Sequence, residues 1–243
     1  MRVLLSGASG VIGRELMALI EREPGCTVSA TASRQAFFPD DCRGDVLIDF
    51  SHPALTERSL DLARELGIPA VVGTTGLTDA CRERIDAAAR QIPVCVAANF
   101  SIGVNLMLAL VERAALDLPD SFDIEISEIH HRRKRDAPSG TALALGDAVC
   151  AARGCDLATA RQMDRSSRDR ARAPGEIGFQ VVRGGDVAGE HTVFFLGDGE
   201  RLEISHRASD RSIFARGALL AAKKLTGLGP GRVDFASLVL GSQ

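Results

Sequence analysis

The stretch "EIHHRRKRDAPSGTAL", residues 128–143, gathers residue types that can transfer protons and bind anions. His130 and Lys134 are four residues apart, so the periods of a strand and of a helix both place them on roughly the same side. A histidine can give or take a proton near neutral pH, and a nearby lysine can supply a proton or stabilise developing negative charge. These two residues are therefore the candidate catalytic pair.

The same stretch predicts a binding site for an anion. Three arginines within residues 132–135 concentrate positive charge in a chain whose formal net charge is -3. Ser139, Gly140 and Thr141 follow at the predicted start of a helix, where backbone N–H groups and a hydroxyl form a carboxylate site. A solvated basic face and a nucleic-acid patch are the alternatives. Because the basic run leads directly into the predicted helix start, the sequence favours a small, multiply anionic ligand.

A glycine-rich loop near the start of the chain predicts a dinucleotide site. The sequence "GASGVIG" places Gly7, Gly10 and Gly13 between an apolar run and a helical pattern. Glycines there let the backbone turn tightly and approach a pyrophosphate at the helix N-terminus. The spacing is one residue longer than the usual fingerprint, so the strand–loop–helix setting supports the prediction. The alternative is a glycine turn that binds no ligand.

The residues after the second apolar run bear on the choice of cofactor. Enzymes that use NAD carry an acid there, which binds the ribose hydroxyls. Here "ATASRQ" provides Ser33 and Arg34 and no carboxylate. A hydroxyl followed by a guanidinium suits a 2′-phosphate, which favours NADPH and leaves NADH as a second cofactor. The alternative is that Arg34 is a solvated surface residue.

Two further predicted strand ends are rich in glycine or polar residues. They are "GTTG", residues 73–76, and "AANFS", residues 97–101. Ligands of open α/β sheets bind beyond the carboxyl ends of the strands, so these loops are expected near the nicotinamide. Ordinary turn and helix-cap chemistry is the alternative.

The elements that must position these residues fall into two groups. In the first hundred residues, apolar runs without polar alternation are separated by helical patterns, which predicts a parallel sheet covered on both faces. This is a Rossmann-type, doubly wound α/β layout. The runs are "RVLLSG", "TVSATAS", "DVLIDFS", "IPAVVGTT" and "IPVCVAANF".

The rest of the chain predicts a C-terminal α+β domain with a mixed or antiparallel sheet. The apolar residues alternate in "FDIEISEIHH", "IGFQVVRGG", "GEHTVFFLGDG" and "RLEISHRAS". Helices are expected at 103–116 and 141–154, a surface loop at 156–175, and a final helix at 212–225 packed on the first domain. The predicted domains are 1–100, completed by 212–243, for the dinucleotide, and 101–211 for substrate binding and oligomerisation.

The composition excludes several classes of function. The chain has 243 residues, of which 45% are hydrophobic and 25% charged, and it has no Trp or Tyr. The negative net charge and the absence of stacking platforms argue against nucleic acid as a partner. No apolar run approaches the ~20 residues that span a bilayer. The six cysteines are scattered without a C-x-x-C, so we expect reduced thiols, no metal and a cytoplasmic location.

Five segments together resemble the 4-hydroxy-tetrahydrodipicolinate reductase family, also called dihydrodipicolinate reductases. They are "GASGVIG", "GTTG", "AANFSIGVN", "HHRRKRDAPSGTA" and "RGGDVAGEHTVFF", and the resemblance runs from residue 2 to about residue 225. It implies the reduction of a cyclic dicarboxylate by NAD(P)H in lysine and diaminopimelate biosynthesis. It also implies a homotetramer.

The resemblance assigns individual roles. His130 would be the proton donor or acceptor and Lys134 the second proton donor, while His131, Gly140 and Thr141 would bind the carboxylates of the substrate. The pyrophosphate would be bound by Gly7, Ala8, Ser9, Gly10, Val11 and Ile12, and the adenosine ribose by Ser33 and Arg34. The nicotinamide side would be lined by Gly73, Thr74, Thr75, Ala97, Ala98, Asn99 and Phe100. Arg211 and Phe214 would contact the cofactor from the C-terminal segment. Many members have an acid where this chain has Ser33.

Two other functions stay open at this stage. An aspartate or amino-acid dehydrogenase would share the two-domain plan but should lack the joined "HH…K…PSGT" pattern, which this chain has. A redox sensor that binds dinucleotide and uses the basic segment on nucleic acid would show steeply salt-dependent binding and no turnover. The acidic net charge disfavours the sensor.

Overall fold

The structure is a computed structural model that describes residues 1–166 and 169–241. The chain divides into two compact units, Met1–Ile102 with Arg211–Gln243, and Gly103–Asp210. Residues 167–168, within the predicted surface loop, and 242–243, within the predicted C-terminal completion of the first domain, lie outside the described residues. In the described part, no helix is both long and apolar enough to cross a bilayer.

The first unit is built on a parallel sheet. Within the described residues this sheet has six strands in the order β11-β5-β4-β3-β1-β2, and each neighbouring pair is parallel. The predicted doubly wound sheet is therefore confirmed. The strands are β1 (Arg2–Ser6), β2 (Thr27–Ala32), β3 (Val46–Asp49), β4 (Ala70–Val72), β5 (Pro93–Val96) and β11 (Gly231–Val233).

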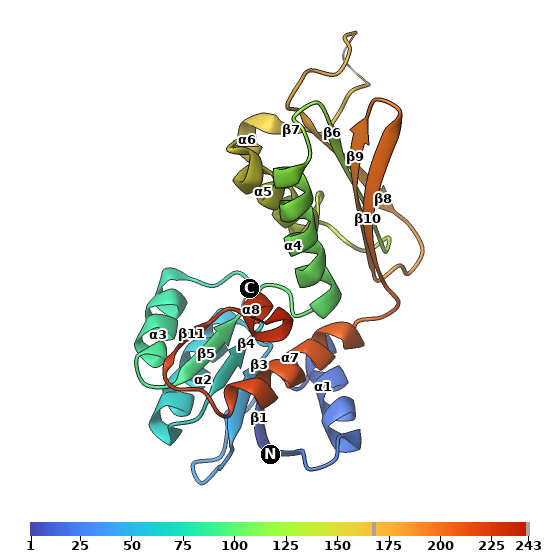
Figure 1. Cartoon of the computed structure of the whole chain (residues 1–243). Coiled ribbons are helices and arrows are strands. Elements are labelled where there is room, and N and C mark those ends of the chain that lie inside the picture. Colours follow the sequence, from blue (N-terminus) through green and yellow to red (C-terminus); the bar gives the residue numbers. More distant parts are fainter. Residues whose placement is uncertain (167–168, 242–243) are drawn as a thin grey trace. The chain divides into compact units, whose positions relative to one another are not determined.

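Helices cover both faces of this sheet, as Figure 1 shows. The helices α1 (Val11–Arg22) and α7 (Ser212–Leu225) pack on one face, and α2 (Pro53–Leu66) and α3 (Asp79–Ala89) on the other. Successive strand residues enter opposite cores: Val3 and Leu5 join one, and Leu4 joins the other. Because both faces are buried, these strands show no polar alternation.

The helix at 212–225 packs on the first unit as predicted, but it is not the last element. It is followed by β11, which pairs with β5, and by α8 (Phe235–Leu240). The ring of Phe235 lies 4.7 Å from that of Phe100, centroid to centroid. The three residues of β11 are too few for a periodic pattern, and their pairing depends on the edge that β5 presents.

The second unit contains a mixed sheet, which confirms the prediction for this region. Within the described residues the strand order is β10-β9-β6-β8-β7; β6 is parallel to β8 and antiparallel to β9. The helices α4 (Ile102–Asp117) and α5 (Gly140–Arg153) contribute to its core. The strands are β6 (Asp123–His130), β7 (Arg161–Gln162), β8 (Ile177–Arg183), β9 (Gly189–Gly197) and β10 (Glu200–Ala208).

The prediction of a surface loop throughout 156–175 is wrong at its start. The segment opens with the short helix α6 (Leu157–Ala160), capped by the side chain of Asp156, and continues into β7. Pairing with β8 buries Gln162, and this tertiary contact leaves no local signal. Later in the segment, arginines form ion pairs with acids inside the unit, for example Arg172 with Asp123 at 2.5 Å.

Candidate functional site

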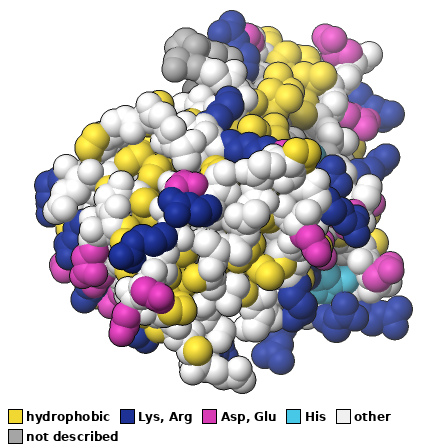
Figure 2. Space-filling view, turned by 90° about the horizontal axis from the view of Figure 1, so that it is seen from below, with side chains coloured by type: hydrophobic (Ala, Val, Ile, Leu, Met, Phe, Trp, Pro, Cys, Tyr) yellow, Lys and Arg dark blue, Asp and Glu magenta, His cyan; other side chains and the backbone are white. Residues whose placement is uncertain are grey.

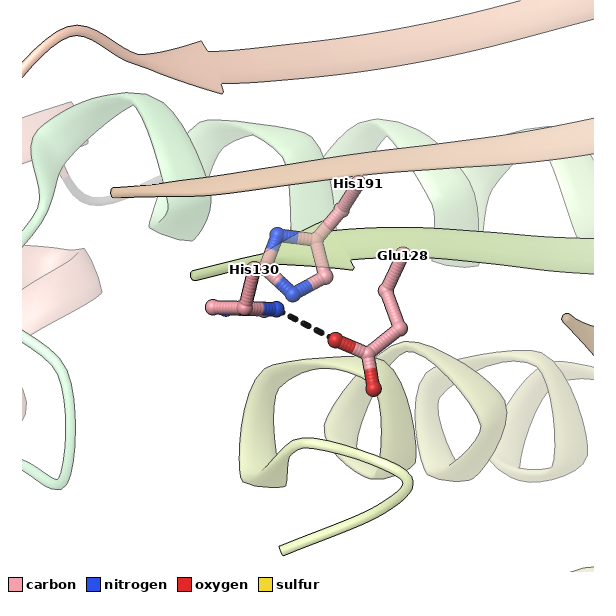
Figure 3. Close-up of side chains that lie close together, drawn as sticks. All are labelled: Glu128, His130 and His191. Atoms are coloured by element: carbon pink, nitrogen blue, oxygen red, sulfur yellow. Dashed lines mark ion pairs between the residues drawn. The ribbon is translucent and has the colours of Figure 1, made fainter. Parts of the chain in front are cut away.

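Strand β6 presents a glutamate and a histidine on the same buried face. Glu128 and His130 are 1% and 8% exposed, and the strand period of two puts both side chains on one side. The antiparallel register with β9 places His191 directly opposite Glu128. Figure 3 shows the three side chains converging. The rings of His130 and His191 lie 5.1 Å apart, edge to face.

The carboxylate of Glu128 is held from several directions. Its Oε1 accepts from the backbone N–H of Ser139 at 2.8 Å and from Nη2 of Arg183 at 3.0 Å. Its Oε2 accepts from Nη1 of Arg183 at 3.1 Å and lies against Nδ1 of His130, a contact that becomes an ion pair when the imidazole is protonated. Burial acts to raise the pKa of Glu128, but the bonds from Arg183 and Ser139 outweigh it and hold the pKa below its usual value. The group is therefore ionised at neutral pH.

Burial lowers the pKa of His130 below its usual value. The negative charge of Glu128 works in the opposite direction, and the positive charge of Lys134 adds to the lowering. In the free protein His130 is therefore biased toward the neutral imidazole near pH 7. A bound anion next to the ring would raise this pKa again, because it favours the protonated form.

Ser139 links the start of α5 to Glu128 on β6 and to His191 on β9. Its Oγ accepts from the N–H of Ala142 at 3.1 Å, which caps the helix, and lies 3.0 Å from Nε2 of His191. Since the hydroxyl accepts from Ala142, its own proton is available for His191. Burial, and next the charge of His130, lower the pKa of His191 to about 4, so His191 is neutral at pH 7.

The other predicted substrate residues lie around this cluster in the second unit. Nζ of Lys134 is 2.7 Å from Oδ2 of Asp136. His131 is half-buried, and its backbone N–H donates to the carbonyl of Val187 at 2.8 Å. Gly140 and Thr141 form the first turn of α5. The structure thus brings the five predicted catalytic and substrate-binding residues to the segment between β6 and the start of α5.

The surface near these residues is basic. Arg132, Arg133 and Arg135 are exposed, as expected for groups that attract an anion. Figure 2 shows histidine atoms at the surface with Lys and Arg side chains beside them. The cis peptide bond between Ala137 and Pro138 lies in the same segment.

Potential metal-ligand atoms of Glu128, His130 and His191 lie within 4.8 Å of one another. Carboxylate oxygen and imidazole nitrogen are ligands for divalent metals. However, the guanidinium of Arg183 already binds both carboxylate oxygens, and its charge would oppose a cation at the same place. We therefore interpret the cluster as a hydrogen-bonded acid–base group.

The glycine loop of the first unit requires its glycines for steric reasons. Gly7 has a φ of +84°, and a Cβ there would lie 2.2 Å from the carbonyl oxygen of Phe50. At Gly13 a Cβ would lie 2.1 Å from the carbonyl oxygen of Gly7. Gly10 offers no side chain to cap α1, so an anion is a suitable partner for the first-turn N–H groups.

A pocket of about 250 Å³ opens beside this loop. It contains residues predicted for the pyrophosphate and for the ribose, and it brings in a third strand end after β3. The lining residues are Gly7, Ser9, Gly10, Ser33, Arg34, Phe50, Ser51, His52 and Leu55. No carboxylate is among these described residues. The donors and the cation fit a phosphate-bearing ligand.

The remaining predicted cofactor residues differ in how much side chain they present. Oγ1 of Thr74 donates to Asp49 at 2.7 Å and accepts from the N–H of Ser51 at 2.9 Å. The ring of Phe100 is 1% exposed and packs against Phe50. These two side chains are therefore part of the framework of the first unit, and only their backbone could meet a ligand.

The other members of that set lie at the ends of strands or helices of the first unit. Gly73 packs tightly, since a Cβ there would lie 2.3 Å from the ring of Phe50. Thr75 and Ala98 are exposed, whereas Ala8, Ile12, Ala97, Asn99, Arg211 and Phe214 are half-buried and Val11 is exposed at the start of α1.

Sequence analysis missed three members of the acid–base cluster. Glu128 could have been found, because it precedes His130 by two residues on a predicted strand and must share its face. His191 and Arg183 carried no such signal. Their proximity depends on the register of β9 and β8 against β6.

Comparison with known proteins identifies the family. Two family models match the chain: "Dihydrodipicolinate reductase, N-terminus" over residues 1–100, and "Dihydrodipicolinate reductase, C-terminus" over residues 103–239. A curated relative from Thiobacillus denitrificans, named 4-hydroxy-tetrahydrodipicolinate reductase, is 42% identical over 261 residues, covering 98% of each chain. One of the same name from Alkalilimnicola ehrlichii is 45% identical over 250 residues, covering 98% of this chain and 94% of the relative.

A solved structure agrees in fold. The dipicolinate-bound dihydrodipicolinate reductase from Paenisporosarcina sp. TG-14 has a TM-score of 0.76 at 23% identity, and the match covers 96% of this chain and 97% of that one. The predicted resemblance is thus confirmed over nearly the whole chain. With both family models matched and full-length relatives above 40% identity, the chain belongs to the dihydrodipicolinate reductase family of enzymes.

Proposed function

We propose that this enzyme reduces 4-hydroxy-tetrahydrodipicolinate with NADPH as its preferred cofactor, and that His130 and Lys134 manage the protons. The observation that carries the proposal is a buried, carboxylate-paired His130 within a strand-to-helix segment whose helix start can bind a carboxylate. Family membership supports the reductase chemistry.

The first unit would hold the cofactor. The backbone from Gly7 to Ile12 would bind the pyrophosphate at the start of α1, and the loops at 73–75 and 97–100, with Arg211 and Phe214, would line the nicotinamide side. Arg34 and Ser33 line the same pocket as the glycine loop, which supports a 2′-phosphate there. The serine hydroxyl can also bond a ribose hydroxyl, so NADH is the second cofactor. When bound, the reduced nicotinamide supplies a hydride.

The second unit would hold the substrate. A ring with two carboxylates needs several donors, and His131, Gly140 and Thr141 would provide them near the start of α5. The exposed arginines at 132, 133 and 135 would raise the local concentration of a dianion. The dipicolinate in the solved relative's title is itself a small dicarboxylate, which supports this choice of substrate class.

His130 would control the proton that balances hydride addition. After loss of water the ring carries a conjugated C=C–C=N system, and adding hydride to it leaves electron density that a proton must relieve. The dianion would raise the pKa of His130 and load it with the proton that it then transfers. The positive charge of Lys134 acts on the pKa of His130. Lys134 would stabilise the developing negative charge on the substrate and serve as a second proton donor.

We also propose a homotetramer that associates through the second unit. The sheet face away from α4 and α5 carries the apolar side chain of Val182, which is 47% exposed. Analytical ultracentrifugation should give four times the monomer mass of 25.7 kDa. A purely monomeric species at micromolar concentration would contradict this part of the proposal.

The first experiment is a coupled assay, because the substrate is unstable. Pyruvate and aspartate semialdehyde are condensed by a separate synthase, and the loss of nicotinamide absorbance is followed with NADPH and with NADH. We expect oxidation that depends on the synthase and is faster with NADPH. Folded protein that binds dinucleotide but oxidises neither cofactor would refute the substrate assignment.

Arg34→Ala tests the cofactor preference. The variant should weaken NADPH about tenfold and NADH much less, because one charge-assisted pair to the 2′-phosphate is lost. Dissociation constants for both cofactors, measured by fluorescence titration, give the comparison. Arg43→Ala, at a cation outside the pocket, is the matched control. Equal losses for both cofactors would show that Arg34 does not contact the 2′-phosphate.

A further inference from the structure

We propose that Glu128, clamped by Arg183, is a positioning residue that fixes His130 with its proton on Nδ1 and leaves Nε2 as the atom that exchanges a proton with the substrate. The catalytic consequence rests on the proposed function. The tautomer is inferred from the close approach of the two groups and can be measured without substrate.

The clamp on Glu128 is set by charge and by geometry. Both terminal nitrogens of Arg183 reach the carboxylate, at 3.0 and 3.1 Å, in the two-pronged arrangement that guanidinium and carboxylate prefer. Nη2 of Arg183 also donates to the carbonyl of Asp136 at 2.7 Å, so the guanidinium is itself anchored to the chain between β6 and α5. With 1% exposure, Glu128 has little freedom to turn away.

An ionised carboxylate can only accept hydrogen bonds. Oε2 of Glu128 closely approaches Nδ1 of His130, although this contact does not meet the geometry of a hydrogen bond in the structure. An acceptor oxygen so close to the nitrogen favours a hydrogen on Nδ1 over a lone pair. In the neutral ring Nε2 is then unprotonated, and it is the position that gains or loses the exchangeable proton. On β9, Gly189 lies beside this atom, since a Cβ there would be 3.0 Å from Nε2. The glycine leaves room beside the reactive nitrogen.

The same carboxylate also positions the start of α5. Its Oε1 accepts the backbone N–H of Ser139, the residue that caps this helix. The proton-transfer histidine and the proposed carboxylate-binding turn are thus fastened to opposite oxygens of one side chain. Glu128 therefore sets the position of each relative to the other, a role that a neutral or shorter side chain would fill poorly.

The first test needs no variant. In protein labelled with ¹⁵N-histidine at pH 8, we expect a protonated-type shift at Nδ1 of His130 and an unprotonated-type shift at Nε2. The spectrum of His130→Gln assigns the signal among the five histidines. A wild-type spectrum with the proton mainly on Nε2 overturns the proposal, whatever the activity proves to be.

The second test is Glu128→Gln. Its amide can donate to Nδ1, so the ring should shift toward the Nε2–H tautomer and kcat should fall about 10²-fold, with KM for the cofactor unchanged. Loss of the negative charge should also move the alkaline limb of the kcat profile to lower pH, because the protonated imidazole is less favoured. A purely structural role would lower stability without changing the tautomer or this limb.

Glu125→Gln is the matched control, since Glu125 lies on the same strand, faces the other side and is also ion-paired with arginines. Its tautomer signal and pH profile should stay as in the wild type. Unchanged tautomer and kcat in folded Glu128→Gln would refute the proposal. If that variant does not fold, the wild-type spectrum still decides. Wild-type protein without turnover would refute the proposed function but leave the tautomer measurement valid.

Discussion

Each unit buries a carboxylate near the end of a strand, Asp49 in the first and Glu128 in the second, and the two have different kinds of partner. In the first unit, Asp49 accepts from three hydroxyls: Ser51, Thr56 at 2.5 Å and Thr74 at 2.7 Å. In the second, Glu128 is held by a guanidinium, a backbone N–H and a titratable imidazole. Asp49 is fully buried, and Glu128 is nearly so.

The difference separates a structural junction from a reactive one. Hydroxyl donors change neither charge nor protonation near neutral pH, so Asp49 ties β3, α2 and the loop after β4 into one rigid framework. An imidazole can change protonation, and the guanidinium keeps the carboxylate ionised while it does so. Satisfying a buried acid with cationic and titratable partners thus makes a group that can support proton transfer. The following predictions test this contrast.

The largest effect is expected where the reactive junction loses its proton carrier. His130→Gln should reduce kcat by ~10²-fold or more while cofactor binding survives, because the proposed general acid is removed. Lys134→Ala should have an effect of similar size. The coupled assay and a cofactor titration measure the two quantities. Thr56→Val, which alters the Asp49 junction, is the control and should keep near-normal kcat in folded protein; normal turnover in both active-site variants would refute the assigned roles.

Acid should destabilise the reactive junction. His191 has its pKa lowered to about 4, by burial and next by the charge of His130, with Glu128 opposing and His206 and Lys134 adding to the lowering. A lowered folded-state pKa means that the unfolded chain takes up the proton first. The stability that depends on neutral His191 is therefore complete above pH ~6.5 and is lost as pH falls toward 4, by on the order of 3 kcal/mol.

Urea unfolding between pH 7.5 and 4.5 measures this loss. His130 and His206, whose pKa values burial also lowers, act in the same direction. The variant His191→Gln should show a flatter dependence on pH across this window. An equally steep dependence in the variant would mean that other groups govern the acid sensitivity.

The structural junction should fail differently. In Asp49→Asn the amide NH₂ group cannot accept the hydrogen bonds that the hydroxyls donate to Asp49. We therefore expect the free energy of unfolding to fall by about 1–3 kcal/mol. Urea unfolding at pH 7.5 measures it. Asp45→Asn is the matched control, because Asp45 is a half-buried aspartate at the surface, paired with Arg2, and should contribute less than ~1 kcal/mol. Equal losses would mean that burial of Asp49 adds nothing.

The smallest effect is expected beside Nε2 of His130. Gly189→Ala would put a methyl group 3.0 Å from that nitrogen, and we expect kcat to fall up to about tenfold through displacement of the ring. Gly184→Ala is the control, since a Cβ there meets nothing within 4 Å. Thermal unfolding of both variants separates displacement from loss of fold. An unchanged kcat would show that Nε2 does not need the space.

The doubly wound sheet was predictable because its signal is local. Strands buried on both faces must be apolar throughout, and the chain has to return through helices, so runs such as "RVLLSG" followed by a helical pattern leave few alternatives. The glycine loop was predictable for a related reason. Only glycine fits at position 7, where a Cβ would collide with the backbone of Phe50.

Local signals also misled in places. The polar, Arg-rich segment after Cys155 suggested a loop, whereas Arg165, Arg170 and Arg172 are paired with acids of the same unit and the start of the segment adds a strand to the sheet. Thr74 and Phe100 lie at the strand ends predicted to line the nicotinamide, and their side chains are part of the framework; the predicted contact with the cofactor stays a prediction for their backbone. Composition cannot distinguish a solvated charge from a paired one.

The sequence by itself determined the family, the sheet of the first unit, and His130 with the helix start that follows it, since each depends on neighbouring residues. Only the tertiary structure decided which groups surround His130. Arg183 and His191 lie more than fifty residues further along the chain and arrive through the pairing of β8 and β9 with β6. Strand register is a long-range property, and a shift of one residue would turn both side chains to the opposite face.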